Sequence, residues 1–310
     1  MKFPGRNKAN QLAIYLYFGL AILPVLLVLV IFVLLYYKSS PILEKTSLIP
    51  MLSDQSWLPS QGEFGFSSFI MGTICVTGLA VFLAVPPCVL GALYLSEYAS
   101  SRVRGWIKPV FDIFAAIPSV VFGIWGVIVI VPFVKDFSGL ASQFSDQLPF
   151  LAAHNTIGYS ILAAGMVLAL MICPYIVTLS YEVLRSVPDG YRQAPLALGA
   201  TTWQMIKHVI LPKSLPGILA AIVLGISRAL GETMAVVMVV GNVPRNPTSI
   251  FDAAYTLPGL IANNYGEMLS IKNFDAALML AALILLVMVM FFNLGSAFLL
   301  KRVLKRQGQI

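Results

Sequence analysis

Two opposite charges, Arg228 and Glu232, stand four positions apart in the apolar stretch RALGETMAVVMVVGN, residues 228–242. A charge facing lipid at mid-membrane costs at least about 2.5 to 3.5 kcal/mol, so both side chains must face protein or water. An arginine guanidinium is a planar fork of N–H donors that suits an oxyanion such as phosphate. We predict that Arg228 handles an anion, while Glu232 holds the fork and keeps the anion from binding too tightly. The alternative is an internal ion pair with no ligand.

The helix that must position these charges is predicted over residues 215–240, which places Arg228 near mid-membrane. At 100° per residue, Arg228 and Glu232 share one stripe of that helix with Leu224 and Val236. Small residues at helical spacing flank this stripe on both sides: Ala221, Gly225, Ala229 and Thr233 on one, and Ser227, Gly231 and Ala235 on the other. Such spacing indicates close helix contacts, so we expect the charges to point into the bundle or a subunit interface.

Composition indicates that this helix belongs to a membrane bundle. The chain has 310 residues, of which 59% are hydrophobic and 11% charged. The apolar residues gather in blocks at 12–37, 69–95, 110–134, 157–180, 215–240 and 276–300. Each block can cross a hydrocarbon core of roughly 30 Å as a helix. The first is too long for a signal-peptide core and no small-x-small cleavage site follows it. We predict an all-α membrane protein with six transmembrane helices.

Basic residues lie mainly in alternate loops, which predicts the orientation. They are Lys2, Arg6 and Lys8; Arg102, Arg104 and Lys108; Arg185, Arg192, Lys207 and Lys213; and Lys301, Arg302, Lys305 and Arg306. Positive charge is retained on the cytoplasmic side, so we expect both termini to be cytoplasmic. The net charge of +7 then belongs to that face and its anionic lipid headgroups, and does not indicate nucleic-acid binding.

The loop before the fifth block reads EVLRSVPDGYRQAPLALGATTWQMIKHVILP, residues 182–212. Thr201 and Gln204 have the spacing of a capping box, which predicts a helix start, and Pro212 predicts its end near Leu211. Gly199 allows a turn between this helix and a short apolar segment before it. Two short helices with alanine and leucine on the water side are expected. They could lie on lipid headgroups, or form a knob that docks into a cytoplasmic partner.

The second half of this loop resembles the EAA loop of ABC-importer permeases. The matching positions are Gln193, Ala194 and Pro195 for the triplet, Gly199 for the glycine, and Val209, Leu211 and Pro212 for the Ile-x-Leu-Pro ending. Gln193, Pro195 and Val209 replace glutamate, alanine and isoleucine. The resemblance implies docking onto an ATPase, without the charged interaction that a glutamate at position 193 could make. Pro195 is expected to interrupt or shorten the first helix. We call residues 182–213 the coupling loop.

Two stretches, IPSVVFGIWG at 117–126 and RALGETMAVVMVVGN, are similar to PstC-type permease subunits of Pst phosphate importers. The resemblance spans roughly 69–300. It implies the fold of a type I ABC-importer permease in a bacterial inner membrane, without catalytic residues, metal or cofactor of its own. The partners it implies are a PstA-like permease subunit, two PstB-like ATPase subunits that bind ATP, and a PstS-like phosphate-binding protein. A permease for molybdate or phosphonate, an ion-coupled secondary transporter and a structural membrane adaptor are the alternatives.

In the third block, Pro118 interrupts backbone hydrogen bonding, while Gly123 and Gly126 remove side-chain bulk. Together they predict either a packing kink or a bend that lines the path. The chain holds no GxxxxGK[ST] phosphate loop, so it cannot hydrolyse ATP by that route. We expect an amino-terminal segment with the first helix and an outer loop over 1–68, a permease core over 69–300, and a basic cytoplasmic tail over 301–310.

Overall fold

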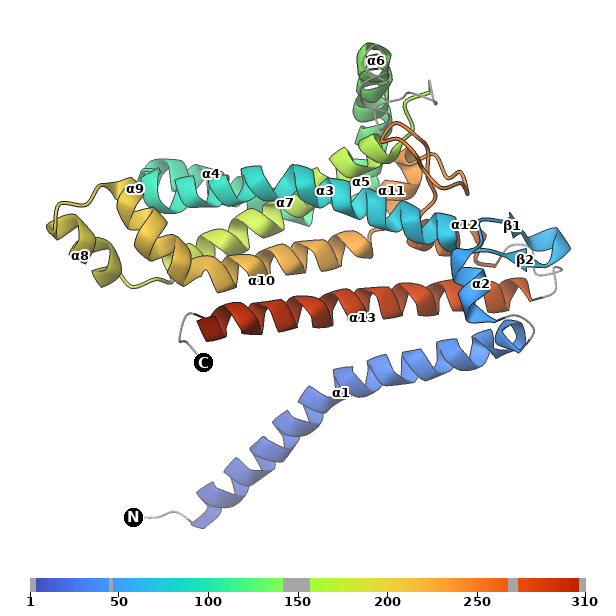
Figure 1. Cartoon of the computed structure of the whole chain (residues 1–310). Coiled ribbons are helices and arrows are strands. Elements are labelled where there is room, and N and C mark those ends of the chain that lie inside the picture. The colour runs from blue at the N-terminus through green and yellow to red at the C-terminus, as the bar shows by residue number, and fades with distance from the viewer. Residues whose placement is uncertain (1–3, 45–46, 142–156, 267–272, 307–310) are drawn as a thin grey trace.

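The computed structural model of the chain describes residues 4–44, 47–141, 157–266 and 273–306. Within these ranges the chain is mostly helical, and six helices are long and apolar enough to cross a membrane, as the sequence predicts. The long single helices are α1 (Pro4–Leu43), α3 (Ser67–Leu93), α7 (Ile161–Arg185), α10 (Leu211–Leu230) and α13 (Phe274–Arg306). Figure 1 shows α3, α7, α10 and α13 as a bundle, with α1 diverging from it toward the N-terminus.

Helix α7 lies at the centre of the bundle, where it contacts α3, α4 and α10. Several of its large aliphatic side chains, including Leu168 and Ile172, are fully buried. Small residues allow the close approach to α3: a Cβ atom placed on Gly165 would lie 3.0 Å from the side chain of Leu79. In contrast, α1 contacts the bundle mainly through α13, and its side chains over 14–34 are nearly all exposed. Such an apolar surface suits lipid or a partner subunit.

One end of the bundle carries a small aromatic cluster. A hairpin of β1 (Trp57–Leu58) and β2 (Glu63–Phe64) pairs Trp57 with Phe64, and the 3-10 turn η1 (Pro59–Gln61) connects the strands. The Trp57 ring packs on Phe69 of α3 at 5.0 Å and on Phe274 of α13 at 6.3 Å between centroids. The short helices α2 (Leu48–Ser53) and α12 (Leu257–Asn264) complete this end. The cluster joins the segment after α1 to the bundle.

The third predicted span is wrong in its bounds. Residues 110–134 were expected to form one helix, but α4 (Ser101–Ala116) ends before Pro118 and a new helical run begins at Ser119. The run consists of α5 (Ser119–Trp125), a π-helical turn η3 (Gly126–Ile130) and α6 (Val131–Ala141). Ile117 is extended, with ψ of 129°, because the residue before a proline is excluded from helical geometry. Figure 1 shows α6 turning away from the bundle.

The fifth span differs at both ends from the predicted 215–240. Helical structure starts at α9 (Thr202–Met205), passes through the π-helical turn η6 (Ile206–Ile210) and continues as α10. The predicted end near Leu211 is wrong because Pro212 falls in the first turn of α10, where its missing N–H is tolerated. At the other end the helix stops at Leu230, and α11 (Met234–Val239) follows a break at residues 231–233.

Helix α13 continues through the predicted basic tail as far as Arg306, so residues 301–306 extend the last span. Residues 307–310 of that tail, and residues 1–3 and 45–46 of the predicted amino-terminal segment, lie outside the described ranges. The division into 1–68, 69–300 and 301–310 stays a prediction.

Candidate translocation path and coupling loop

Arg228 lies in the last turn of α10 and is exposed on the surface of this chain. Its guanidinium carbon lies 4.1 Å from the centroid of the Tyr175 ring on α7, which is cation–π geometry. The Tyr175 hydroxyl donates a hydrogen bond to the Ala115 carbonyl at 2.9 Å. That carbonyl is near the end of α4, where the break at Pro118 ends the helical hydrogen-bond ladder. The break therefore helps to orient the ring that supports Arg228.

Glu232 has a different neighbour from the one expected. Among the described residues, Arg228 and Glu232 form no ion pair, because α10 ends at Leu230 and the predicted stripe through both residues is not continuous. Glu232 lies in the break, where its carboxylate accepts a hydrogen bond from the Ala235 amide at 3.4 Å, in the first turn of α11. Carboxylates are favoured near a helix N-terminus. Tyr175 thus takes the supporting position that was predicted for Glu232.

A second polar contact lies beside Arg228. Ser227 donates a hydrogen bond to the side-chain carbonyl of Asn293 on α13 at 2.5 Å, and Asn293 is exposed on this chain. Sequence reasoning did not single out Asn293, although an amide within the apolar block 276–300 was a usable signal. The exposed surface formed by α10 and α13 therefore carries two polar groups: the guanidinium of Arg228, which the Tyr175 ring of α7 supports, and the side-chain amide of Asn293, which Ser227 holds.

Gly123 and Gly126 are buried at helix contacts. A Cβ atom on Gly123 would lie 2.6 Å from the Met238 sulfur, and one on Gly126 would lie 2.7 Å from Val167. These contacts bring the α5–η3 run against α11 and α7, which favours the packing interpretation for the two glycines. Pro118 forms the break at the start of this run, as the predicted bend requires.

The coupling loop folds into two short helices, as predicted. α8 (Gly190–Ala197) is followed by Gly199, whose φ of +83° is the left-handed conformation that favours glycine. α9 begins at the predicted capping box: the Thr201 amide donates to Gln204 Oε1 at 2.8 Å, and the Gln204 amide donates to Thr201 Oγ1 at 3.3 Å. The two helices therefore meet at a fixed turn.

The turn of the coupling loop presents apolar side chains to the outside. Leu198 is 89% exposed and Trp203 is 59% exposed. Gln193 and Ala194 are exposed on α8, which continues two residues beyond Pro195, so the proline does not interrupt the helix. The remaining motif positions lie at the base of the loop: Val209 in η6, and Leu211 and Pro212 in the first turn of α10. Of the motif residues, Gln193, Ala194, Gly199 and Pro212 are thus exposed, and Pro195, Val209 and Leu211 are half-buried.

Arg192 anchors the loop, and sequence reasoning had treated it only as a loop charge. Its side chain is 11% exposed and makes an ion pair with Glu97, which is 3% exposed, at 3.0 Å. Glu97 lies in η2 (Tyr94–Tyr98), the π-helical turn that follows α3. An acid at the end of an apolar span, facing a basic loop, was the available signal. The pairing of Arg192 with Glu97 could not be predicted from the sequence, because it depends on the tertiary fold.

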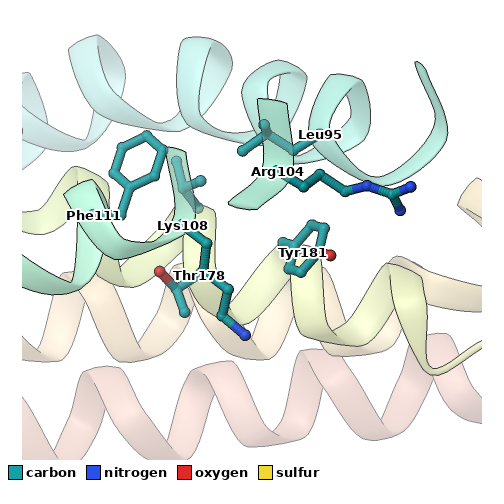
Figure 2. A pocket seen from close by; sticks show the side chains of 7 residues that line it. Leu95, Arg104, Lys108, Phe111, Thr178 and Tyr181 are labelled. Atoms are coloured by element: carbon teal, nitrogen blue, oxygen red, sulfur yellow. The ribbon is translucent and has the colours of Figure 1, made fainter. Parts of the chain in front are cut away.

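The same side of the bundle holds a second cluster of charges, between α4 and α7. Lys108 pairs with Glu182 at 2.5 Å, and this hydrogen bond, with the carboxylate charge, raises the pKa of Lys108. Figure 2 shows Arg104 and Lys108 pointing in different directions around a small hollow that includes Tyr181. The two cations do not converge on a common ligand position.

The six long apolar helices of the described residues are typical of a multi-pass membrane protein. The chain belongs to the family described as binding-protein-dependent transport system inner membrane component, which matches residues 88–307.

The relatives agree with this assignment over most of the chain. It is 35% identical over 258 residues to the probable ABC transporter permease protein YqgH of Bacillus subtilis, covering 83% of this chain and 79% of that protein. It is 33% identical over 261 residues to the phosphate transport system permease protein PstC of Mesorhizobium japonicum, covering 83% and 80%. A probable phosphate transport system permease protein PstC of Methanocaldococcus jannaschii is 30% identical over 288 residues, covering 90% of each chain.

Solved structures share the fold at lower identity. A chain of a bacterial alginate ABC transporter, solved with a periplasmic protein bound to an alginate pentasaccharide, superposes with a TM-score of 0.60 at 15% identity, covering 93% of this chain and 95% of that one. A chain of the MetNI methionine ABC transporter, in an inward-facing conformation, has a TM-score of 0.56 at 20% identity, covering 75% and 93%. The fold is that of type I ABC-importer permeases, as the sequence resemblance implied.

Proposed function

We propose that this chain is the membrane-spanning permease subunit of an ATP-driven phosphate importer. The observation that carries the proposal is Arg228, a cation inside an apolar span and exposed on the surface of the chain. No described residue accepts a hydrogen bond from its guanidinium; the Tyr175 ring supports it from one face. Its donors therefore remain available for an oxyanion. Two of the relatives named above are phosphate transport permeases.

The exposed coupling loop supports the ATP-driven part of the proposal. Leu198 and Trp203 present an apolar surface beside the rigid turn at Gly199, which suits docking into a groove on an ATPase. From α9 the helix runs without interruption to Arg228, so a displacement of the loop can reach the anion position. On this view, separate PstB-like subunits bind and hydrolyse ATP. This chain contributes no catalytic group.

The remaining partners follow from the family. A PstA-like second permease subunit would complete the path along the exposed surface of α10 and α13, and a PstS-like protein would deliver phosphate at the end of the bundle that carries the hairpin. Both termini would be cytoplasmic in a bacterial inner membrane, since basic residues gather at that side. Glu232 would moderate anion binding from the break at residues 231–233, without pairing directly with Arg228.

Uptake of radiolabelled phosphate into vesicles containing the complete complex tests the proposal. We expect uptake to require ATP and loaded binding protein, to persist when ionophores collapse ion gradients, and to resist competition by molybdate and phosphonate. Uptake that needs an ion gradient and no ATP would indicate a secondary transporter. Preferential uptake of molybdate or phosphonate would assign a different oxyanion.

A further inference from the structure

A buried ion pair attaches the coupling loop to the membrane bundle. Arg192 of α8 contacts the Glu97 carboxylate at both oxygens: Nε donates to Oε2 at 3.1 Å and Nη2 donates to Oε1 at 3.0 Å. Ser96 donates a further hydrogen bond to Glu97 Oε1 at 2.7 Å. Two side-by-side donor contacts fix the orientation of the guanidinium as well as its position. The other residues of α8 are exposed or half-buried, so within this helix the burial is confined to Arg192.

The guanidinium of Arg192 also binds the end of α7. Nη2 donates to the Leu184 carbonyl at 2.7 Å, and Nη1 donates to the Val187 carbonyl at 2.5 Å. Carbonyls at a helix C-terminus lack partners within their own helix, and a cation there is favourable. One side chain therefore joins three segments: the end of α3, the end of α7 and the coupling helix α8.

The other half of the coupling loop reaches the bundle by a different route. Beneath α8 and α9 an apolar cluster joins the loop to the ends of the long helices, with the buried members Ala92, Leu184, Val187, Met205, Ile206, Ile210 and Ile218. From α9 the helix continues through η6 into α10. The α9 half of the loop is thus part of the span that bears Arg228. α8 packs on α9 and η6, and Arg192 gives it an additional charged attachment to the ends of α3 and α7.

We propose that Arg192 is a positioning residue for coupling, because its contact with Glu97 makes α8 move together with α3 and α7. We call the Arg192–Glu97 contact the joint. Without the joint, a force on the exposed turn at Gly199 would bend the short segment between α7 and α8 and would not reach the bundle. With the joint, the same force displaces α3 and α7 relative to α10. Tyr175 on α7 and Arg228 on α10 lie across that contact, so the displacement reaches the proposed anion position. The inference rests on the proposed docking of an ATPase at the coupling loop.

The test uses two variants that alter the joint differently. Arg192→Lys keeps the charge but removes the planar fork, so it cannot hold the carboxylate and both carbonyls at once. Glu97→Gln keeps the size of the side chain and removes its charge. The matched control is Lys108→Gln, which breaks the ion pair with Glu182 on the same side of the bundle. That pair is 48% and 52% exposed, and its residues lie on α4 and α7.

Two measurements on the assembled complex are compared. Spin labels at Gly190, where a side chain meets open space, and at Arg102, with the three native cysteines replaced by alanine, report the distance distribution between α8 and the start of α4. Phosphate uptake per ATP hydrolysed reports coupling. We expect Arg192→Lys and Glu97→Gln to broaden the distribution and to lower uptake per ATP by about tenfold or more. ATPase co-purification and basal hydrolysis should be retained, and Lys108→Gln should change none of these quantities.

An unchanged distance distribution in both variants would overturn the joint. A broadened distribution with normal uptake per ATP, or loss of assembly in both variants, would overturn the role in coupling, since these outcomes assign Arg192 to loop stability alone. A wild-type complex that moves no phosphate would contradict the proposed function instead. In that case the distance distributions still decide whether the joint exists.

Discussion

The orientation of Arg228 depends on contacts from two other helices. The Tyr175 ring lies under the guanidinium, and the Tyr175 hydroxyl is held by the Ala115 carbonyl at the end of α4. A cation–π contact of this kind contributes about 0.5 to 2 kcal/mol, which is enough to hold the guanidinium without neutralising its charge. A carboxylate partner would neutralise it. Support by a ring is therefore better suited to anion binding than the predicted ion pair.

Removing the Tyr175 ring should impair transport more than removing its hydroxyl. Tyr175→Leu loses the cation–π contact, and we expect phosphate uptake to fall about tenfold while the complex still assembles. Tyr175→Phe loses only the hydrogen bond to Ala115, worth about 0.5 to 1.5 kcal/mol, and should reduce uptake less. The matched control is Tyr181→Leu on the same helix, which should leave uptake near normal. Equal uptake by Tyr175→Leu and the wild type would contradict this role of the ring.

At the scale of single residues, the sequence predicted the importance of Arg228 but not its contact with Tyr175. Arg228 is identifiable because a cation in an apolar block needs an explanation. Its pairing with Glu232 was inferred from the spacing of a continuous helix, and the break at residues 231–233 removes that spacing. Tyr175 and Asn293 lie on other helices, and their contacts depend on tertiary packing that one sequence does not reveal.

The coupling loop is the element whose local structure was best predicted. The capping box and the glycine turn are encoded within a few residues, so they follow from local backbone chemistry. The bounds of the third and fifth spans were less predictable. Hydropathy alone does not distinguish a continuous apolar helix from two helices separated by a short break, and the π-helical turn before Pro212 has no simple sequence signal.

A bulky residue at the turn should uncouple the loop from its ATPase. Gly199→Trp forces a side chain into a positive φ that costs roughly 1 to 2 kcal/mol and adds bulk beside Leu198. We expect ATPase co-purification and phosphate uptake both to be lost while membrane insertion is retained. Gly190→Trp is the control, because Gly190 has open space and no such φ. Normal ATPase binding by Gly199→Trp would remove the turn from the docking surface.

The whole molecule has two distinct ends. The hairpin and its aromatic cluster lie at one end of the bundle, and α8 and α9 lie at the other (Figure 1). The number of spans was predictable, because long apolar blocks have few alternatives to transmembrane helices. The arrangement of the blocks, with α7 at the centre and α1 at the edge, was not, since all the blocks are similarly apolar.

The distribution of basic residues predicts which end faces the cytoplasm. A cysteine at Gln61, in the hairpin, should react with an impermeant thiol reagent added outside intact cells. A cysteine at Ser186, after α7, should react only when the membrane is opened. Both positions are exposed, so the difference reports sidedness. The reverse labelling pattern would place the coupling loop outside and exclude docking of a cytoplasmic ATPase.

The central claim joins anion handling at Arg228 to ATP-driven coupling at the loop. The most direct measurement is phosphate uptake by the complete complex carrying both Arg228→Gln and Glu232→Gln. The double change removes one positive and one negative charge, so the net charge of the interrupted span is unchanged. The account predicts normal assembly, ATP hydrolysis still stimulated by the binding protein, and phosphate uptake no greater than in vesicles without the complex. Near-normal uptake by the double variant would contradict it.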